Sequence, residues 1–158
     1  MHVSRLGAAS LALIMAFCAP NLFAGGGDDA GSGITRSPSP HGAAVGFDGL
    51  ANGDTVATPF TVHFRVEGMD IAPAGTEQAN SGHHHLLIDM DELPDPNLPL
   101  PASEQLIHFG GGQTETELTL PAGEHTLQLV FADHRHVPHD PIVKSDRITI
   151  TVTSSAAP

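Results

Sequence analysis

Short runs in which apolar and polar residues alternate dominate the pattern of the chain. The clearest is Pro59–Glu67, where every second side chain is apolar, as expected for a strand with one face on a core and the other in water. Similar runs, separated by turns rich in glycine and proline, lie at 43–47, 105–109, 113–120, 125–133 and 142–152. No segment keeps a 3.6-residue period, so the pattern predicts an all-β fold.

One further strand is apolar on both faces. Residues 82–91 run Gly-His-His-His-Leu-Leu-Ile-Asp-Met-Asp. Side chains on a strand alternate between faces, so His83 and His85 share one face and His84 lies on the other. The apolar residues that follow predict a central strand covered on both sides. Together these runs predict an immunoglobulin-like antiparallel β-sandwich of about seven strands, with a small barrel as the alternative.

The ends of the chain lie outside this pattern. Residues 1–24 combine a positive charge, an apolar run and a small residue before the next segment, which is typical of a secretory signal peptide. Residues 25–40 are rich in Gly, Asp, Ser and Pro and predict a disordered linker. We therefore place the β-sandwich domain at 41–154 and a short tail at 155–158, and we expect a periplasmic or secreted protein.

Cysteine usage agrees with an exported domain that folds on its core alone. Cys18 is the one cysteine of the chain and lies within the predicted signal peptide. A lipoprotein would be acylated at this residue, but Phe17 stands where such a site needs a small residue. The mature domain would then contain neither a disulfide nor a thiolate ligand.

Composition excludes several kinds of partner. The chain has 18 acidic and 6 basic residues and a net charge of −12, which argues against nucleic acid and anionic lipid surfaces. Beyond the signal peptide, no apolar stretch is long enough to span a membrane. There is no Trp or Tyr to form an aromatic platform for sugars, whereas there are 11 histidines. The expected partners are therefore a metal ion and, in addition, another periplasmic protein.

The predicted topology brings distant histidines to one end of the sandwich. The histidine strand is the third and 125–133 the sixth, and these two strands lie side by side and antiparallel in an immunoglobulin-like sheet. The start of the third then meets the end of the sixth and the loop at 134–141, whereas His125 falls at the opposite end. The ligands that this predicts are His83, His85, His136 and His139. Secondary candidates are His84, His134, Asp133, His108 and Met69.

Ligand chemistry favours copper, with zinc as the alternative. Neutral imidazole binds copper, zinc, nickel and iron, and a thioether such as that of Met69 favours Cu(I). Zinc sites commonly combine imidazole with carboxylates such as that of Asp133. Some of these residues have a structural interpretation as well: His84 faces the core, where it could be a hydrogen-bonded buried histidine, and His134 could be solvated loop sequence.

Four sequence blocks resemble a known bacterial family. They are GHHHLLID at 82–89, FGGGQT at 109–114, GEHTLQL at 123–129, and the segment from His136 through Pro138, His139 and Pro141 to Ser145. Over residues 43–152 the chain resembles the family called domain of unknown function 4399. The resemblance implies an exported protein and carries no established activity. Matching positions are His83, His84, His85, Gly112, Gln113, His125, His136, Pro138 and His139; His134 has no counterpart.

Three functions fit these observations. The first is an exported metal-binding protein that carries or buffers copper. The second is an immunoglobulin-like structural or interaction module without metal, whose histidines form a polar or pH-sensitive network. The third is a cupin-like mononuclear metal enzyme, suggested by His83-x-His85 and the segment Pro121–His125. A cupin would need His125 in the site. Enzymatic activity is therefore left open, and binding is favoured over catalysis.

Overall fold

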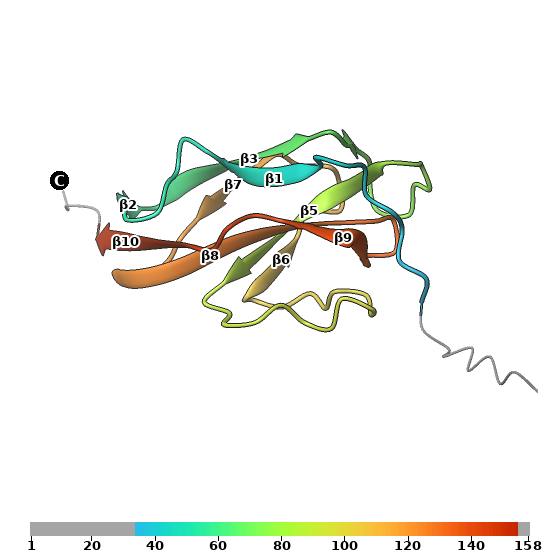
Figure 1. The fold of residues 1–158 in the computed structure, drawn as a ribbon. Helices are drawn as coiled ribbons and strands as arrows, with labels where there is room; N and C mark the ends of the chain where they lie inside the picture. The colour runs from blue at the N-terminus through green and yellow to red at the C-terminus, as the bar shows by residue number, and fades with distance from the viewer. Residues whose placement is uncertain (1–33, 155–158) are drawn as a thin grey trace, which may run out of the picture. The chain divides into compact units, whose positions relative to one another are not determined.

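A computed structural model describes residues 34–154, which form ten strands and no helix (Figure 1). The strands are β1 (Ala44–Asp48), β2 (Thr55–Thr58), β3 (Phe60–Glu67), β4 (Asp70–Ile71), β5 (Ser81–Ile88), β6 (Leu106–His108), β7 (Glu115–Leu118), β8 (Gly123–Ala132), β9 (Pro138–Lys144) and β10 (Ile148–Ser154). The predicted signal peptide at 1–24 and the tail at 155–158 lie outside the described residues. Within the described range, no helix could span a membrane.

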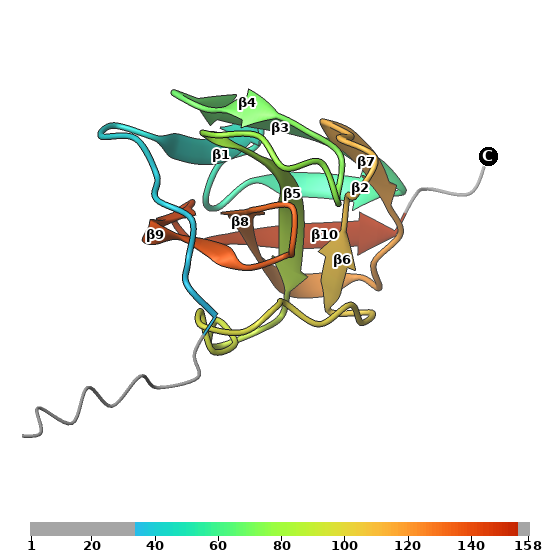
Figure 2. The same ribbon diagram turned by 90° about the vertical axis from the view of Figure 1, so that its right-hand side faces the viewer.

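The strands form two sheets with a shared core (Figures 1 and 2). The smaller sheet has the order β1-β3-β7; the larger has the order β2-β10-β8-β5-β4, with β6 paired to β5 and β9 paired to β8. Phe64 of the smaller sheet packs in one buried cluster with Leu86, Leu127, Phe131 and Ile150 of the larger. The all-β prediction is confirmed, and the fold is sandwich-like and consistent with immunoglobulin-like topology.

The ten strands exceed the seven expected because short edge strands and a break escaped the sequence pattern. The expected last strand at 142–152 is in fact β9 and β10, separated at residues 145–147. Ser145 marks the break: its hydroxyl accepts a hydrogen bond from the backbone N–H of Leu129 at 2.9 Å. The Ser145 side chain thus replaces a backbone acceptor at the point where pairing with β8 passes from β9 to β10.

The pairing of β5 with β8 is the feature that positions the histidines. The strands are antiparallel, with His83 opposite Ala132 and Ile88 opposite Leu127. Every residue of β5 is buried, as its apolar pattern predicted. A Cβ atom at Gly82 would lie 2.2 Å from the carbonyl oxygen of Ala132, so only glycine allows the two strands to approach this closely just before the histidines. The predicted neighbourhood of the third and sixth strands is confirmed.

The outer face of β5 is covered by the proline-rich segment between β5 and β6. This segment is the yellow-green loop in Figure 1, on the side of the larger sheet away from β1 and β3. Leu100 of the segment packs in a second apolar cluster with Leu87, Leu106, Val130 and Ala132. The face of β5 that carries His83 and His85 is therefore buried in a second, smaller core outside the two sheets.

Candidate metal site

Four imidazoles meet on this outer face. His83 and His85 project from β5 on the same side as Leu87. His108 ends β6, directly opposite His85 in the antiparallel pair. His136 lies in the connection between β8 and β9.

Three of the rings have ligand atoms close enough to hold one ion, and the fourth lies beside them. The six distances between their ring centroids lie between 4.5 and 5.9 Å. His108 Nε2 is 3.1 Å from His83 Nε2 and 3.0 Å from His136 Nε2. With metal–nitrogen bonds of about 2.0–2.1 Å, two ligands of a tetrahedral ion stand about 3.4 Å apart. Ligand atoms of His83, His85 and His108 all lie within 4.8 Å of one another. His136 is outside that set and contacts it through His108.

Hydrogen bonding among the rings does not account for the cluster. His108 Nε2, if unprotonated, can accept a hydrogen bond from both of its neighbours, His83 and His136. His85 is fully buried, and neither of its ring nitrogens has a hydrogen-bond partner among the described residues. Buried polar atoms are normally paired, so the unpaired nitrogens of His85 are compatible with a bound ion.

Three of the imidazoles, those of His83, His85 and His108, have lowered pKa values, which favours their neutral form. Burial, together with the neighbouring rings of His108 and His136, lowers the pKa of His83 to about 4. Burial and the rings of His83, His108 and His136 lower the pKa of His85 to about 2. The pKa of His108 is lowered as well, by burial and by His136. Neutral imidazoles offer a lone pair to a metal without first releasing a proton.

The glycine turn after His108 makes room for its ring. A Cβ atom at Gly110 would lie 2.3 Å from His108 Cε1 and 2.5 Å from its Nε2. Gly112 has a φ of +81°, a conformation that glycine adopts without strain. The side chain of Gln113 closes the turn by accepting a hydrogen bond from the N–H of Gly111 at 2.9 Å. The Phe-Gly-Gly-Gly-Gln block therefore seats a candidate ligand rather than a phosphate.

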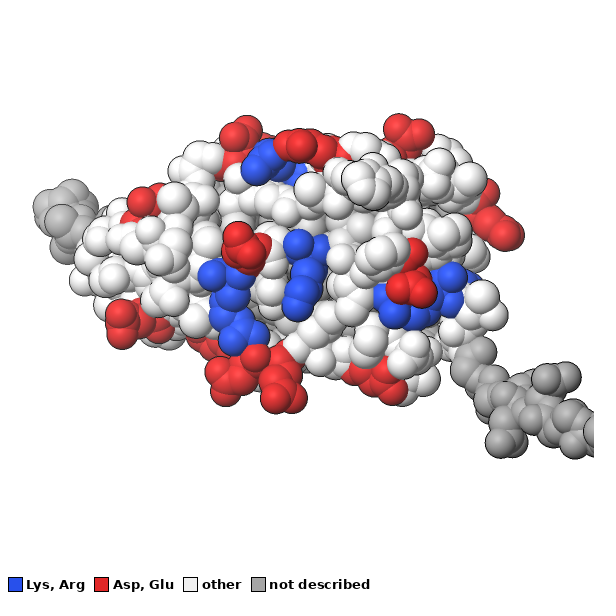
Figure 3. All heavy atoms as spheres, viewed as in Figure 1, with Lys and Arg blue, Asp and Glu red and all other residues white. Residues whose placement is uncertain are grey.

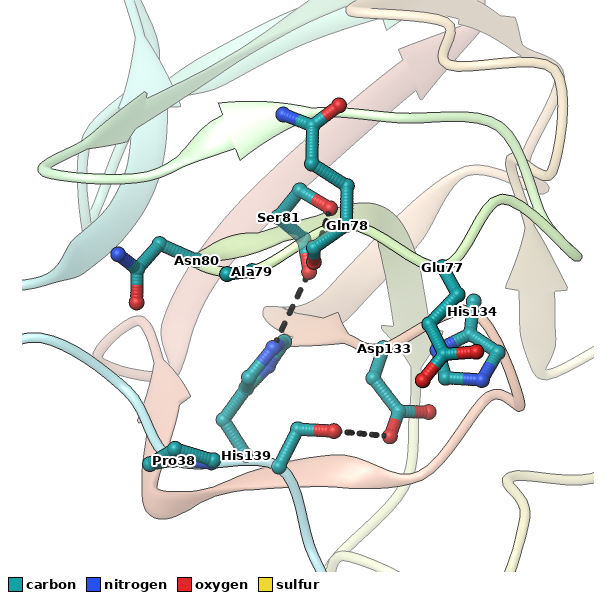
Figure 4. Close-up of a pocket in the computed structure, with 10 residues that line it drawn as sticks. Pro38, Glu77, Gln78, Ala79, Asn80, Ser81, Asp133, His134 and His139 are labelled. Carbon is teal, nitrogen blue, oxygen red and sulfur yellow. Dashed lines mark hydrogen bonds between the residues drawn. The ribbon is translucent and has the colours of Figure 1, made fainter.

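The structure brings three of the four predicted ligands together and places His108, not His139, beside them. His139 is 1 % exposed, and its ring nitrogens face the carbonyl oxygens of Phe131 and Ser81, each at 3.2 Å (Figure 4). The reason is that residues 138–141, expected as loop, begin strand β9 and turn this side chain inward. Both ring nitrogens of His139 thus face backbone acceptors instead of the four rings, and a neutral ring donates to one of these acceptors.

The secondary candidates lie in other surroundings. His84 packs between Phe64 and Phe131 in the core, with ring centroids 5.3 and 5.1 Å away. Burial lowers its pKa to about 4; the backbones of Arg65 and Gln113 oppose this shift, but neither ring nitrogen makes a hydrogen bond of good geometry. The hydrogen-bonded structural role expected for His84 is therefore not found.

Met69, Asp133 and His134 are also outside the set of four rings. Met69 belongs to the cluster between the sheets, on the opposite side of β5 from His83. Asp133 is buried, and hydrogen bonds occupy both of its carboxylate oxygens. His134 lines a separate cavity of about 240 Å³ with Glu77 (Figure 4).

One signal in the sequence pointed to His108. Consecutive strands pair more often than not, and a short strand that follows the proline-rich crossing is well placed to return beside the histidine strand. That pairing would have put residue 108 opposite residue 85, as the structure does. The strand is so short that its sequence pattern alone did not predict which strand it pairs with.

His125 lies at the other end of the β5–β8 pair, as predicted. Its Nδ1 is 2.7 Å from Asp89 Oδ2, and its Nε2 is 2.9 Å from the carbonyl oxygen of Pro121. A cupin-like site that includes His125 therefore does not match this arrangement.

Comparisons with known proteins give a family and no activity. The model of the domain of unknown function DUF4399 matches residues 62–153, which contain all four rings of the cluster. No curated protein and no solved structure matches the chain. The chain belongs to the family defined by the domain of unknown function DUF4399.

Proposed function

We propose that this domain binds one transition-metal ion through His83, His85, His108 and His136, and that it carries or buffers copper outside the cytoplasm. The observation that supports the proposal is the convergence of three imidazoles on a fourth, that of buried His85, whose two ring nitrogens have no partner among the described residues. An ion would satisfy a polar atom that is otherwise costly to bury.

The order of metal affinities favours copper, whereas the arrangement of the rings suits zinc as well. Nearly equal distances between four rings describe a tetrahedron rather than a square. A tetrahedral set of imidazoles suits zinc and Cu(I) better than Cu(II), which favours tetragonal sites. Among divalent ions, nitrogen sites bind Cu(II) more tightly than Zn(II), so the preference for copper rests on this order of affinities and not on the arrangement of the rings. Met69 lies in the core and contributes nothing to this preference.

Carriage fits the site better than catalysis. Catalytic metal sites usually keep one position open for water or substrate, whereas four protein ligands fill a tetrahedral ion. His83 and His85 form a buried floor, and His108 and His136 are partly exposed. The two exposed rings give an ion a route in and out without opening the core.

Surface charge is consistent with a partner that is a cation or a protein. On the face in Figure 3, blue basic side chains stand beside red acidic ones, and Arg36 and Arg65 pair with Asp140 and Glu67. On that face there is no extended basic patch of the kind that nucleic acid needs. The predicted export of the protein would place it where it could meet metal ions entering the cell.

Metal content of the exported protein tests the proposal. The protein, purified without an affinity tag after growth with added copper and zinc, should hold about one ion per chain, because the site can enclose one. The double substitution His83→Ala and His85→Ala should reduce metal affinity at least a hundredfold. His63→Ala is the matched control, since His63 pairs with exposed Glu115 at 3.0 Å and should leave affinity unchanged. Unchanged affinity in the double variant would instead favour a metal-free interaction module.

A further inference from the structure

Asp133 stands at the start of the connection that carries His136. It is 2 % exposed, yet its carboxylate accepts four hydrogen bonds. Oδ1 accepts from the backbone N–H groups of Arg135 and Val137, at 2.8 and 3.1 Å. Oδ2 accepts from the Ser37 hydroxyl at 2.7 Å (Figure 4) and from Arg135 Nη2 at 3.0 Å. A buried carboxylate with four donors is an anchor for the loop around it.

The backbone of this connection is held in an unusual conformation at His136. Its φ is +67°, a left-handed value that residues other than glycine rarely adopt. The turn is closed by two backbone hydrogen bonds, from His136 N to Asp133 O at 2.8 Å and from Asp133 N to Val137 O at 2.9 Å. Such a conformation persists where the surrounding structure imposes it. Here the surroundings are Asp133 and the N–H of Leu100, which donates to His136 O at 2.9 Å.

Ser37 connects this anchor to the segment that precedes the domain. The part of the predicted linker that the structure describes lies along β9, where Arg36 Nε donates to Pro138 O at 3.0 Å. Ser39 N donates to Asp140 O at 3.0 Å, and Pro38 forms an isolated parallel β-bridge with Asp140. The segment therefore reaches the metal-site loop through the bond between Ser37 and Asp133.

We infer that Asp133 is a positioning residue for His136, and that docking of residues 35–39 on Asp133 and β9 slows metal release. This rests on the proposed function. With the anchor in place, the left-handed turn aims the His136 ring at His108, their Nε2 atoms 3.0 Å apart. Without the anchor, the turn relaxes, His136 leaves, and three rings hold the ion more weakly. Undocking of the segment is thus a way to release the ion.

Asp133→Asn tests the positioning role. The amide keeps the shape of the side chain but cannot accept at both former oxygens. Loss of an outer partner of a metal ligand typically costs about 10–100-fold in affinity, and we expect a loss in that range. In a His136→Ala background, the same substitution should cost clearly less than in the wild type, because the part that acts through His136 is gone and only the direct effect of the Asp133 charge on His83 remains. An equal loss in both backgrounds would overturn the inference.

Two serines of the same segment test the coupling to docking. Ser37→Ala removes the bond to Asp133, whereas Ser39→Ala removes a bond from its hydroxyl to Pro141 O at 2.8 Å. We expect Ser37→Ala to speed transfer of the ion to a chelator several-fold and Ser39→Ala to leave the rate unchanged. Equal rates for the two variants would refute the coupling.

A readout without metal separates this inference from the proposed function. In the metal-free protein, Asp133→Asn should move the imidazole NMR signals of His136 and leave those of His63 in place. A wild-type protein that binds no metal would refute the proposed function and leave this measurement valid. Unchanged His136 signals in the variant would refute the positioning role whether or not the protein binds metal.

Discussion

The two ends of the β5–β8 pair use histidine in opposite ways. At the end where β5 starts, fully buried His83 and His85 face other imidazoles, and the side chain of His85 has no hydrogen-bond partner within residues 34–154. At the end where β8 starts, both ring nitrogens of His125 face acceptors, a carboxylate oxygen of Asp89 and the carbonyl oxygen of Pro121. The surroundings thus decide the role: acceptors make a histidine structural, and other imidazoles leave its lone pairs free for a ligand.

The pKa values of the two ends move in opposite directions. Burial and like neighbours lower the pKa of His83 and His85. Burial also tends to lower the pKa of His125, but the hydrogen bonds to Asp89 and Pro121 and the charge of Asp89 outweigh it, so the pKa is raised. His83 and His85 are therefore neutral at neutral pH, whereas the surroundings of His125 favour an imidazolium ion.

The largest expected effect is the increase in the free energy of unfolding when a metal ion binds at the end with the four rings. An ion that binds only the folded protein adds about 4 kcal/mol to the free energy of unfolding at a free concentration a thousand times Kd. Thermal denaturation with metal and with excess chelator measures this increment. His125→Ala should lower the starting stability but keep the same increment, because His125 lies at the other end. An increment that disappears in His125→Ala would show that the two ends are not independent.

A smaller effect is expected from filling the space beside His108. Gly110→Ala places a methyl group where the His108 ring lies, so the ring must move. We expect metal affinity to fall about 10-fold or more, within the range seen when the support of a ligand is lost. The affinity is measured by competition with a chelator of known strength.

Gly111→Ala is the matched control for this substitution. Its Cβ would meet the end of the Gln113 side chain at 3.1 Å, and that flexible chain can move aside. Similar losses of affinity in the two variants would mean that the turn as a whole, rather than the seat of His108, supports the site.

The sequence predicted the parts of the site that depend on strand alternation. The shared face of His83 and His85 follows from their spacing on a strand with buried sides. The approach of His136 followed from the expected pairing of the third and sixth strands, now β5 and β8. The first inference uses a periodicity that extends over a whole strand. The second rests on the antiparallel pairing of the two longest strands, and that pairing holds although the number of strands before them differs from the expected one.

The parts that failed depend on short segments whose structure is set by their neighbours. Strand β6 has three residues, so its own pattern could not rank His108 above other candidates. Pro138 and Pro141 predicted a loop because proline cannot donate a backbone hydrogen bond, but strand β9 includes both. That strand turns His139 toward the carbonyl oxygens of Phe131 and Ser81. Tertiary pairing decided both cases.

The smallest expected effect tests the structural end through Asp89→Asn. Asp89 has a φ of +53°, which asparagine tolerates well, so the backbone should not change. The substitution removes the charge that favours the His125 imidazolium. Because Asp89 is 41 % exposed in its side chain, solvent weakens this pair, and we expect a loss of about 1 kcal/mol in the free energy of unfolding at about pH 6.

The pH dependence of that loss distinguishes the charged pair from a neutral hydrogen bond. The folded pKa of His125 is raised above its unfolded value of about 6.5, so its stabilisation is fully present below that pH and is lost as pH rises through the folded pKa. Urea unfolding of the metal-free wild type and Asp89→Asn should therefore differ most at about pH 6 and least at about pH 9. The lowered pKa values of His83 and His85 reduce stability in acid equally in both proteins and cancel in the difference. A difference that grows with pH would mean that Asp89 acts without the His125 charge, and the contrast between the two ends would then be one of packing alone.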